Sequence, residues 1–348
     1  MRVNHLTREA RAVVPAEAKV NAWIEVRKYY RGATEPHFYH AQHNLILNKG
    51  LDHGLANWGG IIIHPVENVE YCGFEQMFVY VAVGTGTAAP ATTQTGLQNE
   101  LARTAANLGL GAGRTRTRLS NGVYRVTFTR AFNYNQANGN LTEFGGSHSG
   151  NSADGTHTRE LFRDGGGNPI VITKTSNERL AIAYHFEVTL TPTVQTDQGS
   201  INLVDQNNNV VITRLVRGLW IANPYYDFPD YLGFLGEKFN GDPTGDRIGH
   251  WTTSQAANMT YLDTSDVNGG LYGARLAYTN GTYYRDVEGE RGPEASNVSI
   301  FAYGLAGFVN SQVSYKLRFV NSAGSDNPIQ KNKDYRLRLA LRLSVSRL

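Results

Sequence analysis

The chain has 348 residues with 33 basic and 30 acidic side chains, so its formal net charge is only +3. This balance creates no field that by itself argues for nucleic-acid binding. The single cysteine, Cys72, excludes a disulfide framework within the chain and a thiolate metal cluster. No apolar run approaches the roughly 18 residues of a membrane-spanning helix, and the first residues lead into no signal-peptide core. We therefore expect a soluble, untargeted protein of about two domains.

Helical patterns are few and short. Leu51, Leu55 and Trp58 lie at positions i, i+4 and i+7, which predicts an amphipathic helix of two or three turns over residues 50–58. A second short helix is predicted to start near Thr95, because this threonine and the glutamine three residues later have the spacing of a capping pair.

Strand patterns dominate the rest of the chain. Residues 179–190 alternate between apolar and mostly polar or small side chains, and the same alternation returns in the last segment, 336–348. A period of two is that of a strand with one buried and one solvated face. Between these segments, residues 201–212 predict a hairpin of two short strands around the turn-prone run 205–209.

Four sequence anchors recur at one spacing of 159 residues. The matching pairs are Asn121-Gly122 and Asn280-Gly281, Asn168-Pro169-Ile170 and Asn327-Pro328-Ile329, Lys174 and Lys333, and Arg179-Leu180-Ala181 and Arg338-Leu339-Ala340. Residues 141–144 also match 298–301 with a slip of two residues. Chance explains one such pair of common turn residues more easily than four at one spacing. We infer a tandem duplication.

The predicted fold class is therefore mainly β, with two tandem duplicated β-barrel or sandwich domains and short helices. An N-terminal arm and the first domain would occupy residues 1–200, and the second domain residues 201–348. Residues 58–120 and 219–279 do not align with one another. Such copies either enclose a ligand cleft or act as successive units of a ring, so that n chains make a pseudo-2n-fold assembly.

Two short motifs resemble catalytic or cofactor signatures without their required context. Residues 84–89 fit the dinucleotide pattern, but Pro90 and the following threonines predict an extended loop instead of a helix N-terminus. Ser147 and His148 are neighbours and would point apart, so we interpret residues 145–150 as a flexible surface loop.

Histidines and carboxylates give no complete site. His37, His40 and His43 would divide between two faces of a strand, and a metal needs its imidazoles on one face. The pairs Asp52-His53 and Asp154-x-x-His157 lack further ligands. Carboxylate pairs such as Asp227 with Asp230 and Glu288 with Glu290 are expected in a chain with 30 acidic residues. We predict no catalytic residue, no cofactor and no metal site, and hence no enzyme.

Arginines line two of the predicted strands. They are Arg114, Arg116 and Arg118 in one segment, and Arg336, Arg338 and Arg342 in the last. They could face phosphates, but the balanced total charge favours a solvated strand face or a salt-bridged subunit contact. The arm Met1 to Pro15 is interpreted as an extension that docks on a neighbouring copy.

Two segments resemble structural proteins of tailed-phage particles. Residues 43–52, HNLILNKGLD, resemble the "HNLI-x-N-x-GL" motif of that group. Residues 83–103 are similar to its segment "GTGT-x-AP-x-T-x-x-T-x-L-x-x-E-x-x-R". The resemblance spans residues 40–190 approximately, and a strand with Ile172-x-Lys174 followed by the strand from Arg179 completes it.

With the repeat, the resemblance is to tail tube proteins of long-tailed, non-contractile bacteriophages (siphoviruses), in the variant with a duplicated tube domain. It implies a structural virion protein of the tail, assembled in the host cytoplasm, without catalysis or cofactor. Three chains would form a pseudo-hexameric ring, and the rings would stack around a lumen. The implied partners are other copies of the chain in homotrimeric rings, the tape-measure, terminator and tip proteins of the tail, and double-stranded DNA in transit, but no membrane.

The two long alternating strands are the candidates for the sheet of an inner barrel. The candidate assembly residues on them are Arg179, Leu180, Ile182, Phe186, Arg338, Leu339, Leu341 and Val345. The segment 145–155 and the arm 1–15 would make contacts between rings.

Other functions fit parts of the same pattern. A minor tail or receptor-binding protein could bind a host glycan through the aromatic residues Trp220, Tyr225, Tyr226 and Tyr231. A capsid decoration or head–tail joining protein would bind capsids or connectors, and a depolymerase would need paired carboxylates in a pocket.

Overall fold

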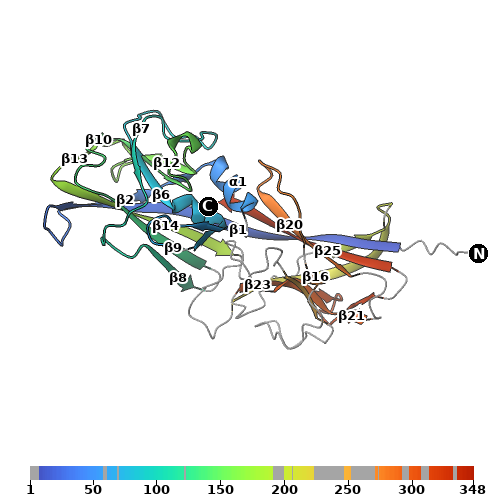
Figure 1. Ribbon diagram of the computed structural model, residues 1–348. Coiled ribbons are helices and arrows are strands. Elements are labelled where there is room, and N and C mark those ends of the chain that lie inside the picture. Colours follow the sequence, from blue (N-terminus) through green and yellow to red (C-terminus); the bar gives the residue numbers. More distant parts are fainter. Residues whose placement is uncertain are drawn as a thin grey trace, which may run out of the picture.

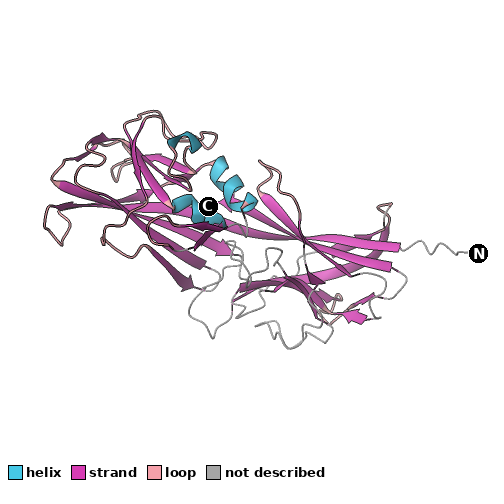
Figure 2. Ribbon diagram, viewed as in Figure 1, coloured by secondary structure: helices cyan, strands magenta, loops and turns pink. Residues whose placement is uncertain are grey.

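The computed structural model describes residues 8–57, 61–68, 70–120, 123–190, 200–205, 207–222, 247–251, 271–272, 274–291, 298–306, 313–331 and 335–348. Strands dominate these residues, as Figure 2 shows, and the predicted mainly-β class is confirmed. Within the same ranges, no helix combines the length and apolar character needed to cross a membrane.

The strands of residues 8–190 and the helical elements lie in the following order. They are β1 (Arg8–Tyr30), β2 (Phe38–His43), β3 (Leu45–Ile46), α1 (Asn48–Ala56), β4 (Ile61–Ile63), β5 (Glu70–Cys72), the 3-10 helix η1 (Gly73–Phe78), β6 (Tyr80–Gly84), β7 (Glu100–Thr104), β8 (Arg114–Ser120), β9 (Val123–Phe132), β10 (Gly139–Leu141), β11 (Glu143–Ser147), the 3-10 helix η2 (Ser152–Asp154), β12 (Thr158–Leu161), β13 (Ile172–Lys174) and β14 (Glu178–Leu190).

The described residues from 200 onward add strands alone. They are β15 (Ser200–Val204), β16 (Val210–Ala222), β17 (Arg247–Trp251), β18 (Leu271–Tyr272), β19 (Ala274–Arg275), β20 (Tyr284–Arg291), β21 (Val298–Ile300), β22 (Ala302–Ala306), β23 (Val313–Val320), β24 (Ile329–Lys331) and β25 (Tyr335–Arg347).

The long strand β1 belongs to both halves of the molecule. Its residues 18–30 pair with β14 in antiparallel register, and its residues 8–20 pair with β25 in parallel register. Because residues 18–20 pair with both strands, β14 and β25 lie on opposite sides of β1. Figure 1 shows β1 crossing the molecule, with β14, β9 and β8 toward one end and β25 and β16 toward the other.

A seven-stranded path therefore runs through both halves in the order β19-β20-β25-β1-β14-β9-β8. Every neighbouring pair in it is antiparallel except β1 with β25. It follows that β14 and β25 run in opposite directions, and so do the two end strands β8 and β19. Within the described ranges, β8 pairs only with β9 and β19 only with β20, so each leaves one backbone edge open.

The same strand pairings occur in both halves. Antiparallel pairs β9–β14, β10–β13, β11–β12, β6–β11 and β6–β7 are matched by β20–β25, β21–β24, β22–β23, β17–β22 and β17–β18. The strand register gives Lys174 a different counterpart in the second half from the one that the sequence match gave. Gly139 is opposite Lys174 and Val298 is opposite Lys331, so the lysine spacing is 331−174 = 157 residues. The residue expected there, Lys333, lies outside the described residues.

The main core lies beneath this path. Apolar residues at alternate positions of β1, β14 and β9 are fully or almost fully buried and pack with α1, η1 and the sheet β3-β12-β11-β6-β7. Phe78 lies at its centre, with its ring 5.2 Å from the rings of Phe128 and Tyr184. The alternation of the terminal strand is also confirmed, since Leu337, Leu339, Leu343 and Val345 of β25 are buried in the same core. Among the described strands no sheet closes into a barrel.

Some local predictions are confirmed and others are wrong. The helix expected over 50–58 is α1, and the hairpin expected over 201–212 is β15–β16. No helix follows Thr95, because the side chain of Gln98 accepts the N–H groups of Thr87 and Ala88 at 2.8 Å and holds an irregular loop. Residues 145–147 are no flexible loop but the buried end of β11, where β6 and the neighbouring β12 flank the strand.

Candidate functional site

The candidate assembly residues lie on interior strands. Both backbone edges of β14 are paired within the chain, to β1 and β9, and both edges of β25 are paired to β1 and β20. The side chains of Leu180, Ile182, Phe186, Leu339 and Val345 are buried in the chain's own core. The side chain of Leu341 lies outside the described part. These strands thus build the interior of the seven-stranded path, while the two ends of this path are β8 and β19.

The two arginines of that set lie outside the core. Arg179 extends over the ring of Tyr134, with 5.6 Å from guanidinium carbon to ring centroid. Arg338 forms an ion pair with Glu290 of β20 at 3.1 Å. Both contacts are internal to the chain.

The polar face of the seven-stranded path carries paired charges of both signs. Arg125 of β9 binds Glu187 of β14 at 2.6 Å, and Arg342 of β25 binds Asp286 of β20 through two bonds of 2.8 Å. Further along β25, Arg336 pairs with Glu290 at 2.9 Å. These pairs are part-exposed, so each adds little stability, but together they leave the face nearly neutral.

Glu143 holds the loop that had matched a dinucleotide motif. One carboxylate oxygen accepts the N–H groups of Gly86 at 3.0 Å and Asn99 at 2.8 Å. The other accepts the N–H of Gln98 at 3.0 Å and the Nε–H of Arg159 at 2.8 Å. A Cβ on Gly86 would meet this carboxylate at 2.3 Å, which explains the glycine without a nucleotide. The expected extended loop is confirmed.

Three histidines from separate segments meet beside α1. His53 lies on α1, His148 follows β11, and His157 precedes β12. One side-chain nitrogen from each lies within 4.8 Å of the others, and the ring centroids are 4.2–4.8 Å apart. Nδ1 of His148 is hydrogen-bonded to Nε2 of His157 at 2.7 Å. The sequence-based prediction treated these histidines separately and missed the cluster.

Close packing of α1 makes this meeting possible. A Cβ on Gly50 would lie 2.5 Å from the carbonyl oxygen of His157, and one on Gly54 would lie 2.3 Å from the ring of Phe74. The two glycines thus let the helix approach both the β11–β12 hairpin and η1. The amide oxygen of Gln76 on η1 then lies 3.0 Å from Nε2 of His53 and orients its ring.

The surroundings keep the three imidazoles neutral. Burial, and next the neighbouring His148, lower the pKa of His53 to about 4. Burial also lowers the pKa of His148, and it acts together with the other two rings to lower that of His157 far below its ordinary value. A neutral imidazole keeps one nitrogen lone pair, which can accept a hydrogen bond or bind a metal ion.

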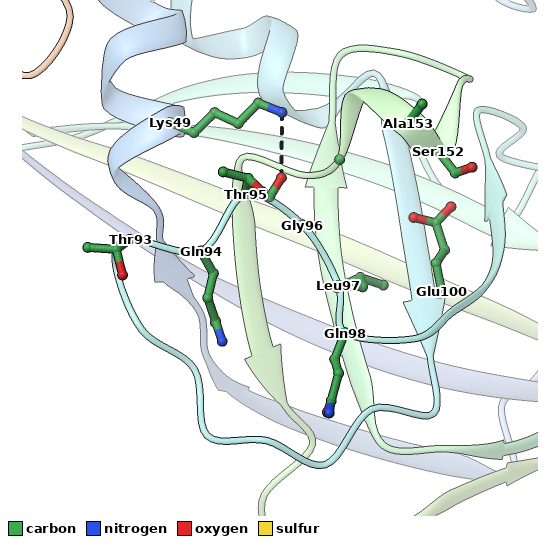
Figure 3. A pocket seen from close by; sticks show the side chains of 11 residues that line it. Lys49, Thr93, Gln94, Thr95, Gly96, Leu97, Gln98, Glu100, Ser152 and Ala153 are labelled. Atoms are coloured by element: carbon green, nitrogen blue, oxygen red, sulfur yellow. Dashed lines mark hydrogen bonds between the residues drawn. The ribbon is translucent and has the colours of Figure 1, made fainter.

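A cavity of about 490 Å³ is lined by Lys49 of α1 and by residues of the loops 93–98 and 152–155, and none of the three histidines is among its lining residues. Figure 3 shows Lys49 of α1 reaching toward the loop of residues 93–98, with residues 152–155 beyond it. The ammonium of Lys49 donates to the carbonyl oxygens of Thr95 and Asp154, which bridges α1 to both loops. Nearby, the hydroxyl of Ser147 donates a hydrogen bond to the carbonyl oxygen of Gly155 at 2.9 Å, so Ser147 has a structural role.

The other sequence-selected histidines stay apart from this cluster. His40 binds Gln42 on β2, and the ring of His37 stacks on Tyr30 with centroids 3.8 Å apart. Of the aromatic set considered for glycan binding, Tyr225, Tyr226 and Tyr231 lie outside the described residues, as does the side chain of Trp220.

The helix α1 also connects the two halves. Asp52 accepts hydrogen bonds from the hydroxyl of Tyr278 at 2.6 Å and from the N–H of Gly281 at 2.7 Å. Arg285 of β20 donates to the carbonyl oxygens of Leu55 and Ala56 at the end of the helix. The adjacent Asp52 and His53 therefore face different partners, which explains why they do not act as a pair.

Comparison with models of protein families, with curated proteins and with solved structures gives no match for this chain.

Proposed function

We propose that the protein is a structural subunit of a phage tail tube, with two tandem copies of a tube domain, and that it assembles with copies of itself. The observation that carries the proposal is the seven-stranded path with an open edge at each end, on β8 and on β19. Open edges readily pair with strands of other chains unless they are covered. A subunit that leaves one at each end of this path is suited to joining neighbours on both sides.

The directions of these strands favour a ring. Since β8 and β19 run oppositely in one chain, a rotation about an axis along the strands brings β8 of one copy beside β19 of the next in antiparallel order. Each contact is then head-to-tail, and head-to-tail contacts close into rings when the rotation closes. The rings would stack into a tube.

The duplication is supported by the recurring strand pairings as well as the sequence anchors. The opposite directions of the equivalent strands β14 and β25 restrict how the two halves can be arranged around a ring axis. Halves that alternate around a ring axis by equal rotations would present these equivalent strands in the same direction. We therefore propose a ring that repeats whole chains, in place of the pseudo-hexamer expected from the sequence.

The ion-paired polar face of the path is suited to line the lumen. Duplex DNA binds proteins mainly through unpaired lysines and arginines that neutralise its phosphates. Arg125, Arg336 and Arg342 of this face are each paired with a carboxylate. Such a face would let DNA pass without retaining it.

Negative-stain electron microscopy with light scattering over increasing protein concentration tests the assembly. We expect rings or hollow tubes. Leu119→Lys places a charge on an exposed position of β8 and should abolish them, because lysine blocks edge pairing. Val171→Lys is the matched control, since Val171 is also exposed but lies outside that edge. A monomer or a discrete oligomer that never stacks would instead favour a receptor-binding, decoration or joining protein.

A further inference from the structure

We propose that His53, His148 and His157 form a binding site for one divalent transition-metal ion of the zinc, nickel and copper class, and that this ion fastens α1 to the β11–β12 hairpin. The inference is independent of the tail-tube proposal, since it rests on the geometry of a single chain.

The ligand chemistry matches this class of ion. Imidazole nitrogen is a preferred ligand of zinc, copper and nickel, whereas calcium and magnesium prefer oxygen. Three histidines are also a recurrent protein ligand set for zinc, with the fourth position left to water or another small ligand. Here they come from a helix and from both arms of a hairpin, so their positions are fixed by packed elements.

The distances need only side-chain rotation. Nitrogens bound to a tetrahedral ion at 2.0–2.1 Å lie about 3.3 Å from one another. The Nδ1–Nε2 pair of His148 and His157, now at 2.7 Å, must open by about 0.6 Å, and the candidate nitrogen of His53 must approach from within 4.8 Å. His148 is only half-buried, which leaves its ring room to turn.

An ion would replace hydrogen bonds that now hold the cluster together. His157 is fully buried, and its Nε2, which faces Nδ1 of His148 at 2.7 Å, is the nitrogen that an ion would bind. Two neutral imidazoles share a single proton in this contact, so the ion displaces one hydrogen bond there. Gln76 contacts Nε2 of His53 at 3.0 Å and Asn57 contacts its Nδ1 at 3.2 Å, so an ion would displace one of these contacts and the other would keep the ring oriented.

The charged groups around the cluster set limits on the site. Lys49 and Arg103 lie close enough to oppose a cation, and the carboxylate of Asp154 favours one. The ammonium of Lys49 would also attract an anionic fourth ligand such as hydroxide or chloride. We therefore expect weaker binding than at a site with a carboxylate ligand.

Binding would act beyond the three rings. Asp52, next to His53, accepts hydrogen bonds from Tyr278 and Gly281, which lie between β19 and β20. An ion that holds α1 in place would therefore also hold the β19–β20 hairpin in place. The ion is then a structural one that stiffens the connection between the two halves.

Titration of the chelator-treated full chain with zinc chloride in a calorimeter tests the site. We expect one ion per chain, and a rise in Tm of about 4 °C at a zinc concentration of 100 Kd. Cobalt should give the visible absorption of a tetrahedral nitrogen site. His148→Ala is the main variant, because His148 is half-buried, and it should weaken zinc binding at least about tenfold.

His43→Ala is the matched control, since His43 is exposed on β2, and it should bind as the unaltered chain does. His53→Asn removes a different ligand and should also weaken zinc binding, and circular dichroism checks that this variant folds. Absence of stoichiometric zinc binding would overturn the proposal, and so would equal affinity in the folded His148→Ala chain.

Discussion

The carboxylate of Glu143 offers the sharpest test of how the first half is held together. Its side chain is fully buried and that of its partner Arg159 is 1% exposed. Glu143→Gln removes the charge while keeping the shape. Removal of one member of a buried ion pair costs about 3–5 kcal/mol, because the other charge stays buried without compensation. We expect the free energy of unfolding to fall by about 4 kcal/mol.

Urea-induced unfolding of the full chain measures this loss, and limited proteolysis reports on the loop of residues 85–99. The neighbouring Glu160 gives the matched control. It pairs with Arg163 at 3.0 Å, but these side chains are 17% and 31% exposed, so Glu160→Gln should cost at most about 1 kcal/mol. Equal losses for the two variants would refute the argument that burial makes the Glu143 pair decisive.

Three further outcomes are expected. Gly54→Ala should lower the unfolding free energy by about 2 kcal/mol in a urea titration, because its Cβ would overlap the ring of Phe74, whereas Gly165→Ala has open space and should be neutral. Burial opposes ionisation of Glu178, but bonds from Thr175 and Lys28 outweigh it and lower its pKa to about 2. Between about pH 2 and pH 4.5 the folded state therefore binds fewer protons than the unfolded state. About 3 kcal/mol of the free energy of unfolding, fully present above pH 4.5, should be lost as the pH falls toward 2. Urea titrations of Glu178→Gln at several pH values should lack this loss. Glu187→Gln combined with Glu290→Gln should create salt-sensitive binding of duplex DNA in fluorescence anisotropy, and unchanged anisotropy would contradict the role assigned to the polar face.

The sequence predicted those elements whose signal is local. The alternation over 179–190 and 336–348 identified β14 and β25, and the run of turn residues 205–209 located the hairpin of β15 and β16. The leucine spacing around Leu51 identified α1. Each of these patterns is generated by neighbouring residues, so no knowledge of the rest of the chain is needed.

Long-range contacts produced the failures. The pair Thr95 and Gln98 has the spacing of a helix cap, yet Gln98 instead binds N–H groups ten and eleven residues earlier in the chain. Likewise, the glycines and serine of 145–147 suggested an exposed loop, but β6 and β12 flank and bury them. Composition alone does not show which distant strand will pair with a glycine-rich segment.

The candidate site illustrates the same limit. His148 and His157 flank a turn, which is a signal that a search for hairpin partners could have used. Their meeting with His53 depends on the close approach that Gly50 and Gly54 allow, and nothing in the sequence marks these glycines as contact points. A cluster of this kind becomes visible only in three dimensions.

The pairing of β1 with β25 joins the first and last described strands of the chain. During synthesis, residues 8–20 emerge more than 300 residues before the strand that completes their pairing. Contacts of such large sequence separation form slowly, and an unpaired strand edge is prone to aggregation until its partner strand has been synthesised. We therefore expect the second half to reach its native state only after translation of β25, with a strong dependence on chaperones and a high sensitivity to truncation of the last strand.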